Sequence, residues 1–298
     1  MNLRELEYVV AVADLKSFSA AAERCCVSQP TLSVQVKKLE EQLGAELFER
    51  TNKRVMLTDV GAAVASAARR ILVEVDTIKQ VARAAHDPLA GAFRLGAFPT
   101  LASYLFPDLV PRLTAAAPNL KLILVEEKTD VLANKLRRGE IDAALLALPV
   151  EDDGLAVRAL FEDPFHFAVW ADHPMAGAAA APIKAMGDWP LLLLEEGHCL
   201  RAQALDVCEL AGAEDEPDMR ATSLETLRQM VRAGTGVTLM PEIAVPLRGD
   251  DGVRYIPFEG EPPARTIGLV HRKSFKRDAL VDVVAECARD AYGTRGAR

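Results

Sequence analysis

Two cysteines stand nine residues apart in the stretch EEGHCLRAQALDVCEL, residues 195–210, of a chain that contains five cysteines. If the stretch is helical, nine residues advance about two and a half turns and rise about 13.5 Å, which places Cys199 and Cys208 on opposite sides of the helix. A disulfide requires Cα atoms within about 4.4 to 6.8 Å. A bond between these thiols would therefore dismantle the helix and force a conformational change.

The two thiols have different surroundings in the sequence. Cys199 follows the apolar run 191–194 and falls in the first turn of the expected helix, where free amides and the neighbouring His198 and Arg201 favour the thiolate. Cys208 borders an apolar stripe made of Leu200, Ala204, Val207 and Ala211. This asymmetry is typical of a reactive cysteine paired with a resolving one.

Other interpretations of the pair stay open on spacing alone. Two unpaired core cysteines are the favoured alternative, because a nine-residue interval is no recognised motif. A zinc site is a weaker alternative, since only His198 stands close in sequence. The remaining cysteines, Cys25, Cys26 and Cys287, are expected to be buried packing residues.

The composition limits the class of protein. The chain is 50% apolar and 26% charged, which suits a globular protein of about two domains. No stretch approaches the ~20 apolar residues of a membrane span, and the amino terminus lacks the pattern of a secretory signal. We therefore expect a cytoplasmic protein, in which a disulfide would be transient. The net charge of -8 gives no indication of nucleic-acid binding.

The amino-terminal segment predicts three short helices. Apolar residues at helical spacing mark a first helix in LRELEYVVAVA, and three alanines in SAAAERCCV mark a second. Ser28 is the expected N-cap of a third helix, with Pro30 in its first turn. The apolar stripe of this third helix is formed by Leu32, Val36, Leu39 and Leu43.

The third helix carries small polar and basic side chains on its other faces, namely Thr31, Ser33, Gln35, Lys37 and Lys38. A helix, a turn and a second helix that presents such groups are typical of recognition in the major groove. The stretch ERTNKRVMLT, residues 49–58, predicts a wing whose cations contact phosphates. Residues 1–58 contain eight Lys/Arg and eight Asp/Glu, so a helical packing module is an equal alternative on pattern alone.

The run from LRELEYVV to LTDVG, residues 3–61, resembles the winged helix-turn-helix of LysR-type transcriptional regulators, including the SQPTLS start of the recognition helix and the FER…LT wing. The resemblance implies promoter DNA and RNA polymerase as partners. The groove residues that it implies are Gln29, Pro30, Thr31, Ser33 and Gln35. The residues that it implies near the DNA backbone are Arg4, Arg50, Lys53 and Arg54.

A long helix is expected from Thr58 to about Ala85, a stretch without proline. Its apolar residues are spaced alternately four and three apart: Val64, Ala68, Ile71, Val75, Ile78, Ala82 and Ala85. This heptad seam predicts pairing with a second copy of the chain, and a dimer also suits two-fold DNA sites. The alternative is an amphipathic helix packed on its own domain. Pro88 and Gly91 then break the helix.

The remaining residues alternate strand-like and helix-like runs, which indicates α/β layers with mostly parallel strands. Helices are expected to begin at Thr100, at Thr129 and at Thr222 or Ser223, each hydroxyl being interpreted as a helix cap. Thr222 and Glu225 also fit a capping box. Helix amino termini at the carboxyl ends of strands converge on a crevice for a polar ligand.

The resemblance to LysR-type regulators extends through this region and implies two periplasmic-binding-protein-like subdomains, with the chain crossing between them near residues 162 and 267. The expected fold class is α+β and α/β. The expected boundaries are a winged helix-turn-helix at 1–58, a linker and dimerisation helix at 59–87, and a regulatory domain at 88–298, divided into subdomain I (92–162 and 268–298) and subdomain II (163–267).

The stretch LLLLEEGHCLRAQALDVCELAGA, together with MRATSLETLRQMVRAGTGVTLMPEIAVP, resembles the redox segment of the peroxide-sensing LysR-type regulators. The resemblance implies that hydrogen peroxide oxidises Cys199 to a sulfenic acid and that Cys208 resolves it as an intramolecular disulfide. It also implies that the refolding alters oligomer geometry on DNA and activates antioxidant genes. The residues implied around the peroxide or the reactive sulfur are Thr100, Thr129, His198, Arg201 and Arg265.

The same resemblance implies no cofactor, no metal, a homotetramer, and a reductant of the glutaredoxin or thioredoxin kind. The sequence departs from the family at one position, because the acidic residue that commonly follows the CLR triplet is Ala202 here, with Asp206 one turn further along the same face. A second hypothesis is a LysR-type regulator that responds to a small anionic metabolite. A third, a thiol peroxidase or thiol-disulfide enzyme, would require a CxxC or an equivalent arrangement and no DNA-binding module, so we expect a regulator and not an enzyme.

Overall fold

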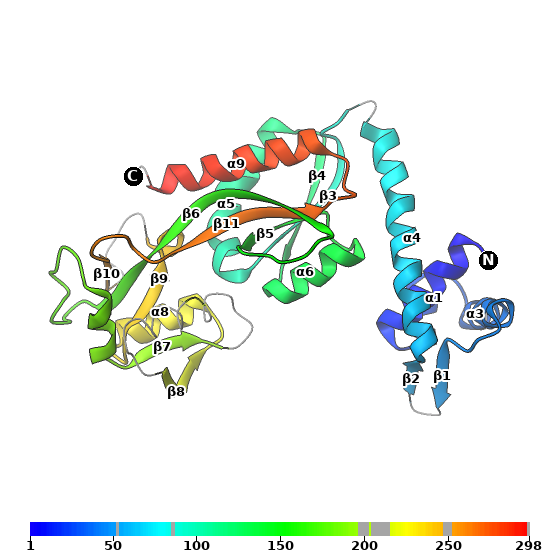
Figure 1. The fold of residues 1–298 in the computed structure, drawn as a ribbon, viewed down its shortest axis with the longest axis horizontal. Coiled ribbons are helices and arrows are strands. Elements are labelled where there is room, and N and C mark those ends of the chain that lie inside the picture. Colours follow the sequence, from blue (N-terminus) through cyan, green and yellow to red (C-terminus); the bar gives the residue numbers. More distant parts are fainter. Residues whose placement is uncertain (52–53, 85–86, 196–202, 204–214, 247–251, 297–298) are drawn as a thin grey trace. The chain divides into compact units, whose positions relative to one another are not determined.

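The computed structural model describes residues 1–51, 54–84, 87–195, 203, 215–246 and 252–296 (Figure 1). The chain divides into two compact units, residues 1–82 and 83–298. No helix within these described ranges is both long and apolar enough to cross a membrane.

The first unit contains three short helices, a two-stranded hairpin and one long helix, as the sequence predicts. Their bounds are α1 Leu3–Leu15, α2 Phe18–Arg24, α3 Gln29–Leu43, β1 Phe48–Thr51, β2 Arg54–Leu57 and α4 Asp59–Ala84. The hairpin strands are antiparallel. The arrangement is a helix-turn-helix followed by a wing and a long helix.

The short helices begin and end where their side chains satisfy free backbone groups. Asn2 and Glu5 form a reciprocal capping box at the start of α1. Ser28 caps α3 by accepting a hydrogen bond from the Thr31 amide, and a proline stands in the first turn, which confirms the predicted start. Gly44 ends α3 in the left-handed conformation, with φ of 66°.

The hairpin and α4 are fastened to the helices by specific contacts. A Glu40 carboxylate oxygen accepts hydrogen bonds from the Leu47 and Phe48 amides (2.8 and 3.2 Å), which ties β1 to α3. The Thr58 hydroxyl accepts from the Gly61 amide and donates to the Glu46 carbonyl. A Cβ atom on Gly61 would lie 1.9 Å from the Leu47 carbonyl oxygen, so only glycine fits at this junction.

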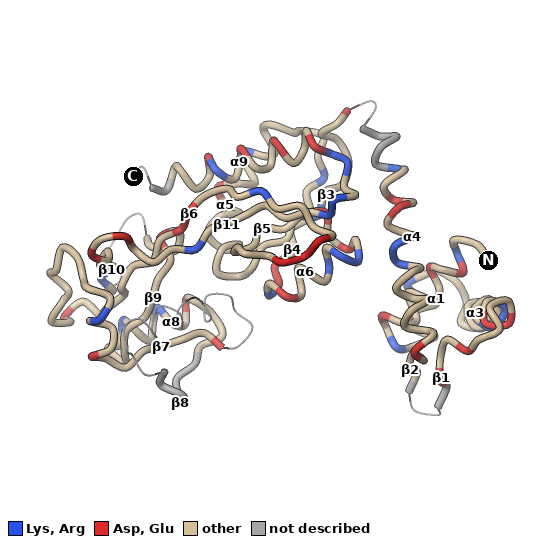
Figure 2. Tube along the Cα trace, in the orientation of Figure 1, with Lys and Arg blue, Asp and Glu red and all other residues tan. Residues whose placement is uncertain are grey.

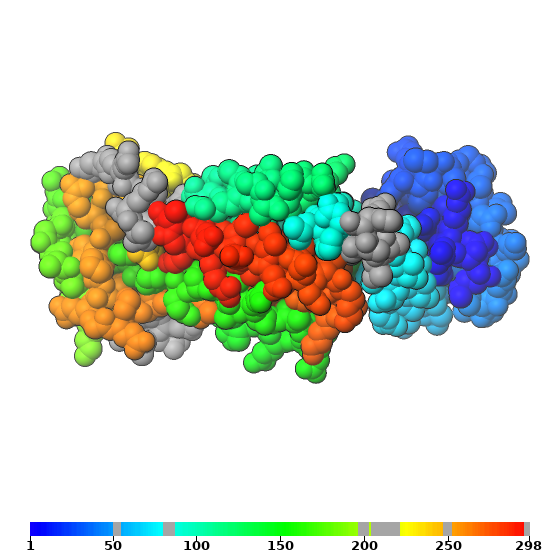
Figure 3. Space-filling view, turned by 90° about the horizontal axis from the view of Figure 1, so that it is seen from above, coloured from blue at the N-terminus to red at the C-terminus, as the bar shows by residue number. Residues whose placement is uncertain are grey.

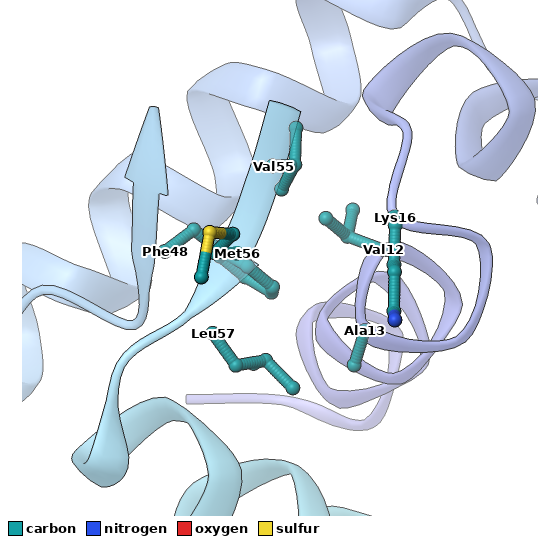
Figure 4. Close-up of a pocket in the computed structure, with 7 residues that line it drawn as sticks. All are labelled: Val12, Ala13, Lys16, Phe48, Val55, Met56 and Leu57. Atoms are coloured by element: carbon teal, nitrogen blue, oxygen red, sulfur yellow. The ribbon is translucent and has the colours of Figure 1, made fainter. Parts of the chain in front are cut away.

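A shallow apolar groove of about 250 Å³ lies between α1 and the hairpin. Figure 4 shows Val12 and Ala13 of α1 across the groove from Met56 and Leu57 of β2. Met56 is 54% exposed. Met56 is therefore an open apolar side chain of the hairpin, whereas Phe48 is buried in the core of the unit.

The second unit contains a twisted mixed sheet with helices and a smaller two-stranded sheet. In chain order the elements are β3 Gly91–Ala97, α5 Pro99–Ala116, β4 Leu120–Glu126, α6 Thr129–Arg138, β5 Ala143–Ala147, β6 Leu155–Trp170, η1 Ile183–Asp188, β7 Leu191–Leu194, β8 Asp215–Ala221, α8 Leu224–Arg232, β9 Thr238–Pro241, η2 Glu242–Ala244, β10 Val253–Pro257, β11 Ala264–Arg272 and α9 Asp278–Gly296. Among these, β8 and β10 were not expected from the sequence.

The strand directions correct the expectation of a mostly parallel sheet. The larger sheet has the order β10-β6-β11-β5-β3-β4, with β9 also paired to β6, and β7 pairs with β8 separately. β3 is parallel to β4 and β5, and β7 is parallel to β8. All described pairings of β6 and β11 are antiparallel. The reason is that the chain leaves one lobe through β6 and returns through β11 in the opposite direction.

Two separate apolar cores define two lobes of this unit. We call lobe I the part built on β3, β4, β5, α5, α6 and α9, and lobe II the part built on β7 to β10 and α8. β6 and β11 run side by side from one lobe to the other (Figure 1), and the predicted crossing points lie inside these two strands. Their pairing contains one irregularity, because Leu160 has no partner between the pairs Ile267–Phe161 and Gly268–Ala159. Figure 3 shows α9 along the surface of lobe I beside α5.

Two of the three expected hydroxyl caps are wrong. α5 is preceded by Phe98 and α6 by Lys128, and neither residue caps its helix with a side-chain bond. Thr100 and Thr129 therefore lie inside the first turns, where their hydroxyls are not committed to capping. The third cap is Ser223, which accepts from the Thr226 amide in place of the expected capping box of Thr222 with Glu225.

Candidate functional site

The residues expected in the DNA groove lie on the surface of α3. Pro30 is exposed there, as are Gln29 and Thr31. The side chains hold one another: the Gln29 amide donates to the Ser33 hydroxyl (3.1 Å), and the Ser28 and Thr31 hydroxyls share a hydrogen bond of 2.7 Å. These donors and acceptors are therefore ordered before any base is contacted. The other predicted residues are also accessible, since Arg4 is exposed and Gln35 is half-buried.

The charged side chains of α3 lie in its later turns, not in its amino-terminal turns. Lys37 and Lys38 are both exposed, and Figure 2 shows acidic positions on the same helix. Of the predicted wing cations, Lys53 lies outside the described residues, and only the backbone of Arg50 and Arg54 is described, within the paired strands. The hairpin is thus confirmed, and the contacts of its cations stay a prediction.

The cysteines of the first unit correct the expectation of buried packing. Cys25 ends α2 and is half-buried, and burial raises the pKa of its thiol. Cys26 is exposed in the turn that leads to α3, with φ of 55°. This left-handed conformation is one that only a few per cent of residues other than glycine adopt. Cys287, on α9, is buried as expected, and burial raises the pKa of its thiol.

The cysteine segment connects the parallel strands β7 and β8. Four residues of the predicted redox centre, Cys199, Cys208, His198 and Arg201, lie outside the described residues. The segment begins directly after Glu195, whose carboxylate accepts a hydrogen bond from the Lys128 ammonium at 2.9 Å. Because Lys128 immediately precedes α6, this contact joins lobe I to the start of the segment.

Thr129 stands next to this contact. Its hydroxyl oxygen is buried and has no hydrogen-bond partner among the described residues. A buried hydroxyl without a partner costs stability, and such groups in native proteins commonly await a ligand, a water or a further side chain. The start of the cysteine segment is therefore held beside a hydroxyl that can bind a small polar molecule.

Thr100 and Arg265 are brought together in the interior. The Arg265 guanidinium donates to the Thr100 hydroxyl (3.1 Å) and to the Thr100 carbonyl (3.2 Å). Its other partner is Asp163, through an ion pair of 2.8 Å in which both side chains are fully buried. The guanidinium also lies 5.1 Å from the centre of the Phe98 ring. Since the Thr100 hydroxyl accepts from a cation, its own proton is free to be donated.

Asp163 was not among the predicted site residues, although a carboxylate inside the apolar stretch LFEDPFHF is a visible signal. The second carboxylate oxygen of Asp163 accepts from the amide of Ile243, which links β6 to η2. Tyr292 of α9 donates to Glu242. Burial, together with the negative charges of Asp163 and Glu242, raises the pKa of Tyr292, so that this hydroxyl stays protonated.

A crevice of about 320 Å³ opens in front of Thr100. Its lining residues come from α5, β4 and the start of α8: Pro99, Thr100, Ser103, Tyr104, Glu126, Thr222, Ser223, Leu224 and Glu225. Two of these are carboxylates, which oppose the binding of an anion. The lining contains neither Thr129 nor Arg265. Within the described ranges, no group of three or more His, Cys, Asp and Glu side chains is placed to hold a metal ion.

Comparisons with known families cover nearly the whole chain. Residues 3–62 match the family described as "Bacterial regulatory helix-turn-helix protein, lysR family", and residues 86–293 match the "LysR substrate binding domain". A curated Escherichia coli protein, "DNA-binding transcriptional dual regulator OxyR", is 42% identical over 290 residues, which are 97% of this chain and 95% of that protein.

Solved structures of OxyR proteins are also similar to this chain. A full-length OxyR variant from Pseudomonas aeruginosa is similar with a TM-score of 0.80 and 39% identity, over 97% of this chain and 95% of that one. A hydrogen peroxide-bound mutant of Corynebacterium glutamicum OxyR is similar with a TM-score of 0.70 and 33% identity, over 99% of this chain and 94% of that one.

Proposed function

Because the chain belongs to the LysR family of transcriptional regulators, and within it to the OxyR group of hydrogen peroxide-inducible activators, we propose that its own cysteines convert peroxide into a change in DNA binding. The protein is a DNA-binding regulator and not an enzyme. A relative solved with bound hydrogen peroxide supports peroxide as the signal. Cys199 is the reactive thiol in this proposal, and Cys208 is the resolving one.

The observation that carries the proposal is the buried Thr129 hydroxyl, one residue after Lys128, which contacts the start of the cysteine segment. The Thr129 hydroxyl is buried without a partner among the described residues, and the Thr100 hydroxyl keeps a proton to donate. The Lys128–Glu195 contact brings the segment to the same end of α6. Peroxide is a small neutral donor and acceptor that such hydroxyls bind. The carboxylates Glu126 and Glu225 in the adjoining crevice argue against the alternative of an anionic metabolite.

The chemistry proposed for the cysteines is a two-electron oxidation. The Cys199 thiolate attacks one peroxide oxygen, the O–O bond breaks, and the leaving hydroxide takes a proton and departs as water. The Cys208 thiolate then attacks the sulfur of the Cys199 sulfenic acid, the S–O bond breaks, and a second water leaves. Two thiols and one peroxide thus give one disulfide and two waters. His198 and Arg201 are proposed to favour the attacking thiolate, and Thr100, Thr129 and Arg265 to hold the peroxide.

We propose a homodimer through α4 as the form that binds two-fold promoter sites. Ile71 and Ile78 of the heptad seam are 41% and 69% exposed within a single chain, although both are large and apolar. Ala68, at the start of the seam, is buried against α1, so the first turns of the helix pack on their own unit. The proposal has four further parts. The chain forms a tetramer, lies in the cytoplasm with the chromosome, acts with RNA polymerase, and is reduced by a glutaredoxin- or thioredoxin-type protein.

The test combines a count of free thiols with promoter footprints, before and after stoichiometric peroxide. A Cys26→Ser background is used, because the exposed Cys26 thiol would itself react with alkylating reagents. We expect the loss of two thiols per chain and a changed footprint. Cys199→Ser should lose no thiol and keep the reduced footprint, and Cys208→Ser should lose one thiol as a sulfenic acid.

Cys287→Ser serves as the matched control, because Cys287 is buried and its thiol pKa is raised. This variant should respond as the parent does. An unchanged footprint in the parent, or a full response in Cys199→Ser, would refute the redox proposal while leaving DNA binding intact.

A further inference from the structure

Val34 is a large apolar side chain on the recognition helix that is 63% exposed. The side chains that α3 buries are Leu32, Val36 and Leu39. With about 100° between successive residues, these three lie about 140° to 160° around the helix axis from Val34. Val34 therefore points directly away from the core of its unit, on the face that a recognition helix presents to DNA.

The neighbours of Val34 on this face are two of the residues expected in the groove, Pro30 and Thr31, and two lysines. Pro30, Thr31, Lys37 and Lys38 lie within about 60° of Val34 around the axis, and all four are exposed. The two lysines supply positive charge for phosphates. The side of the helix that enters the groove thus has an apolar centre flanked by cations.

The Thr31 hydroxyl beside Val34 already shares a hydrogen bond with Ser28, and on another side of the helix Gln29 donates to Ser33. Val34 has no hydrogen-bonding atoms in its side chain, and exposure of its methyl groups to water is unfavourable. Among the groups on base edges in the major groove, the thymine C5-methyl is the apolar one, and small apolar side chains contact it.

We propose that Val34 reads a thymine methyl group in each half-site of the operator. The inference rests on the proposed function, since it assigns a sequence-reading residue to the DNA-binding step. Contact between the valine and the methyl removes apolar surface of both from water. Val34 therefore favours thymine over cytosine at one position of each half-site and adds to the readout by the polar residues of α3.

The experiment begins with DNA sites that the protein itself selects from a random pool. Each thymine of a selected half-site is then replaced by uracil, which keeps the pairing edge and lacks the C5-methyl. We expect one position at which uracil weakens binding about fourfold per half-site, or about fifteenfold when both half-sites are changed, in line with the loss of one buried methyl group each. Val34→Ala should bind the parent site more weakly, and uracil at that position should have no further effect on it.

Leu43→Ala is the matched control, because it shortens another exposed apolar side chain of the same helix, at its far end. This variant should keep the full uracil effect. Circular dichroism of both variants checks that α3 stays helical. Equal uracil effects in the parent and in Val34→Ala, or no sensitive thymine in the parent, would overturn the assignment and leave peroxide sensing untouched. If the protein selects no DNA, this inference and the DNA-binding part of the proposed function both fail.

Discussion

At the scale of single residues, the buried pair of Arg265 and Asp163 ties the strands β6 and β11 to two neighbouring elements. Both side chains are fully buried, and the guanidinium also bonds to Thr100 of α5, whereas the carboxylate bonds to the amide of Ile243 in η2, which packs in the core of lobe I. A charge left without its partner in such a place costs more than the pair itself contributes. The pair therefore specifies one arrangement of these elements.

The prediction for this pair concerns the free energy of unfolding. Arg265→Met leaves the Asp163 carboxylate buried and unpaired, and we expect it to lower the stability of the second unit by about 3 to 5 kcal/mol in urea unfolding. Arg265→Met combined with Asp163→Leu removes both charges and should restore a large part of that loss. If the double variant were less stable than Arg265→Met, the explanation by an unpaired charge would be wrong.

His173 makes a second residue-scale prediction, about pH. The ring is 3% exposed and lies against the rings of Trp170 and Trp189, and its Nδ1 accepts a hydrogen bond from the Met175 amide. Burial lowers the pKa of His173. The neutral form is favoured on folding, so stability is full above the unfolded pKa of about 6.5 and declines as pH falls through that value toward the folded pKa.

The variant that tests this is His173→Asn, because asparagine can keep the acceptor to Met175 and does not titrate. Between pH 7 and pH 5 we expect the unfolding free energy of the variant to fall less than that of the parent. The difference between the two falls should be at most about 1.4 kcal/mol per pH unit. His166, whose pKa burial also lowers, remains in both proteins and cancels in the comparison. Identical pH dependence in the two proteins would contradict the assignment.

At the scale of elements, the junction between the wing and α4 depends on Gly61. A methyl group there would meet the Leu47 carbonyl carbon as well as its oxygen, both of which are backbone atoms that cannot turn away. Gly61→Ala should therefore destabilise the first unit by about 3 kcal/mol and weaken DNA binding, as measured by unfolding and by gel shift.

The matched control for this prediction is Gly293→Ala. Gly293 lies in α9 with nothing near the place where a Cβ would stand. Alanine there should stabilise the second unit by about 0.5 to 1 kcal/mol, because alanine loses less backbone conformational entropy than glycine when the helix forms. If Gly61→Ala had the stability and the DNA binding of the parent, the backbone at this junction would be able to shift, and the prediction would be wrong.

The elements also show what the sequence alone can predict. The helix-turn-helix, its cap at Ser28, the wing and the long helix follow local rules of spacing and capping, and all were predicted. The antiparallel partners of β6 and the role of Asp163 could not be predicted in this way, because they depend on pairings between residues far apart in the chain. For the hydroxyls of Thr100 and Thr129, local sequence rules predicted helix caps, which is wrong, and only the family resemblance indicated a ligand contact, because the same residue types serve in both roles.

At the scale of the whole molecule, the proposed dimer would use the part of α4 that its own unit leaves exposed. Ile78→Asp places a charge at a seam position that is 69% exposed, and should raise the dissociation constant of the proposed dimer about a thousandfold, since two apolar side chains lose their burial. Sedimentation velocity measures this change. Lys79→Asp, which adds a carboxylate one residue away from the seam, should leave the dimer nearly intact. Equal effects of the two variants would exclude the seam as the interface.

The β6–β11 pair joins the two lobes through a ladder of backbone hydrogen bonds that has one interruption. Leu160 has no strand partner there, close to the crossing between the lobes. A bulge of this kind bends the strand that carries it and increases the local right-handed twist. The course that β6 takes from lobe I toward lobe II is therefore set in part at Leu160.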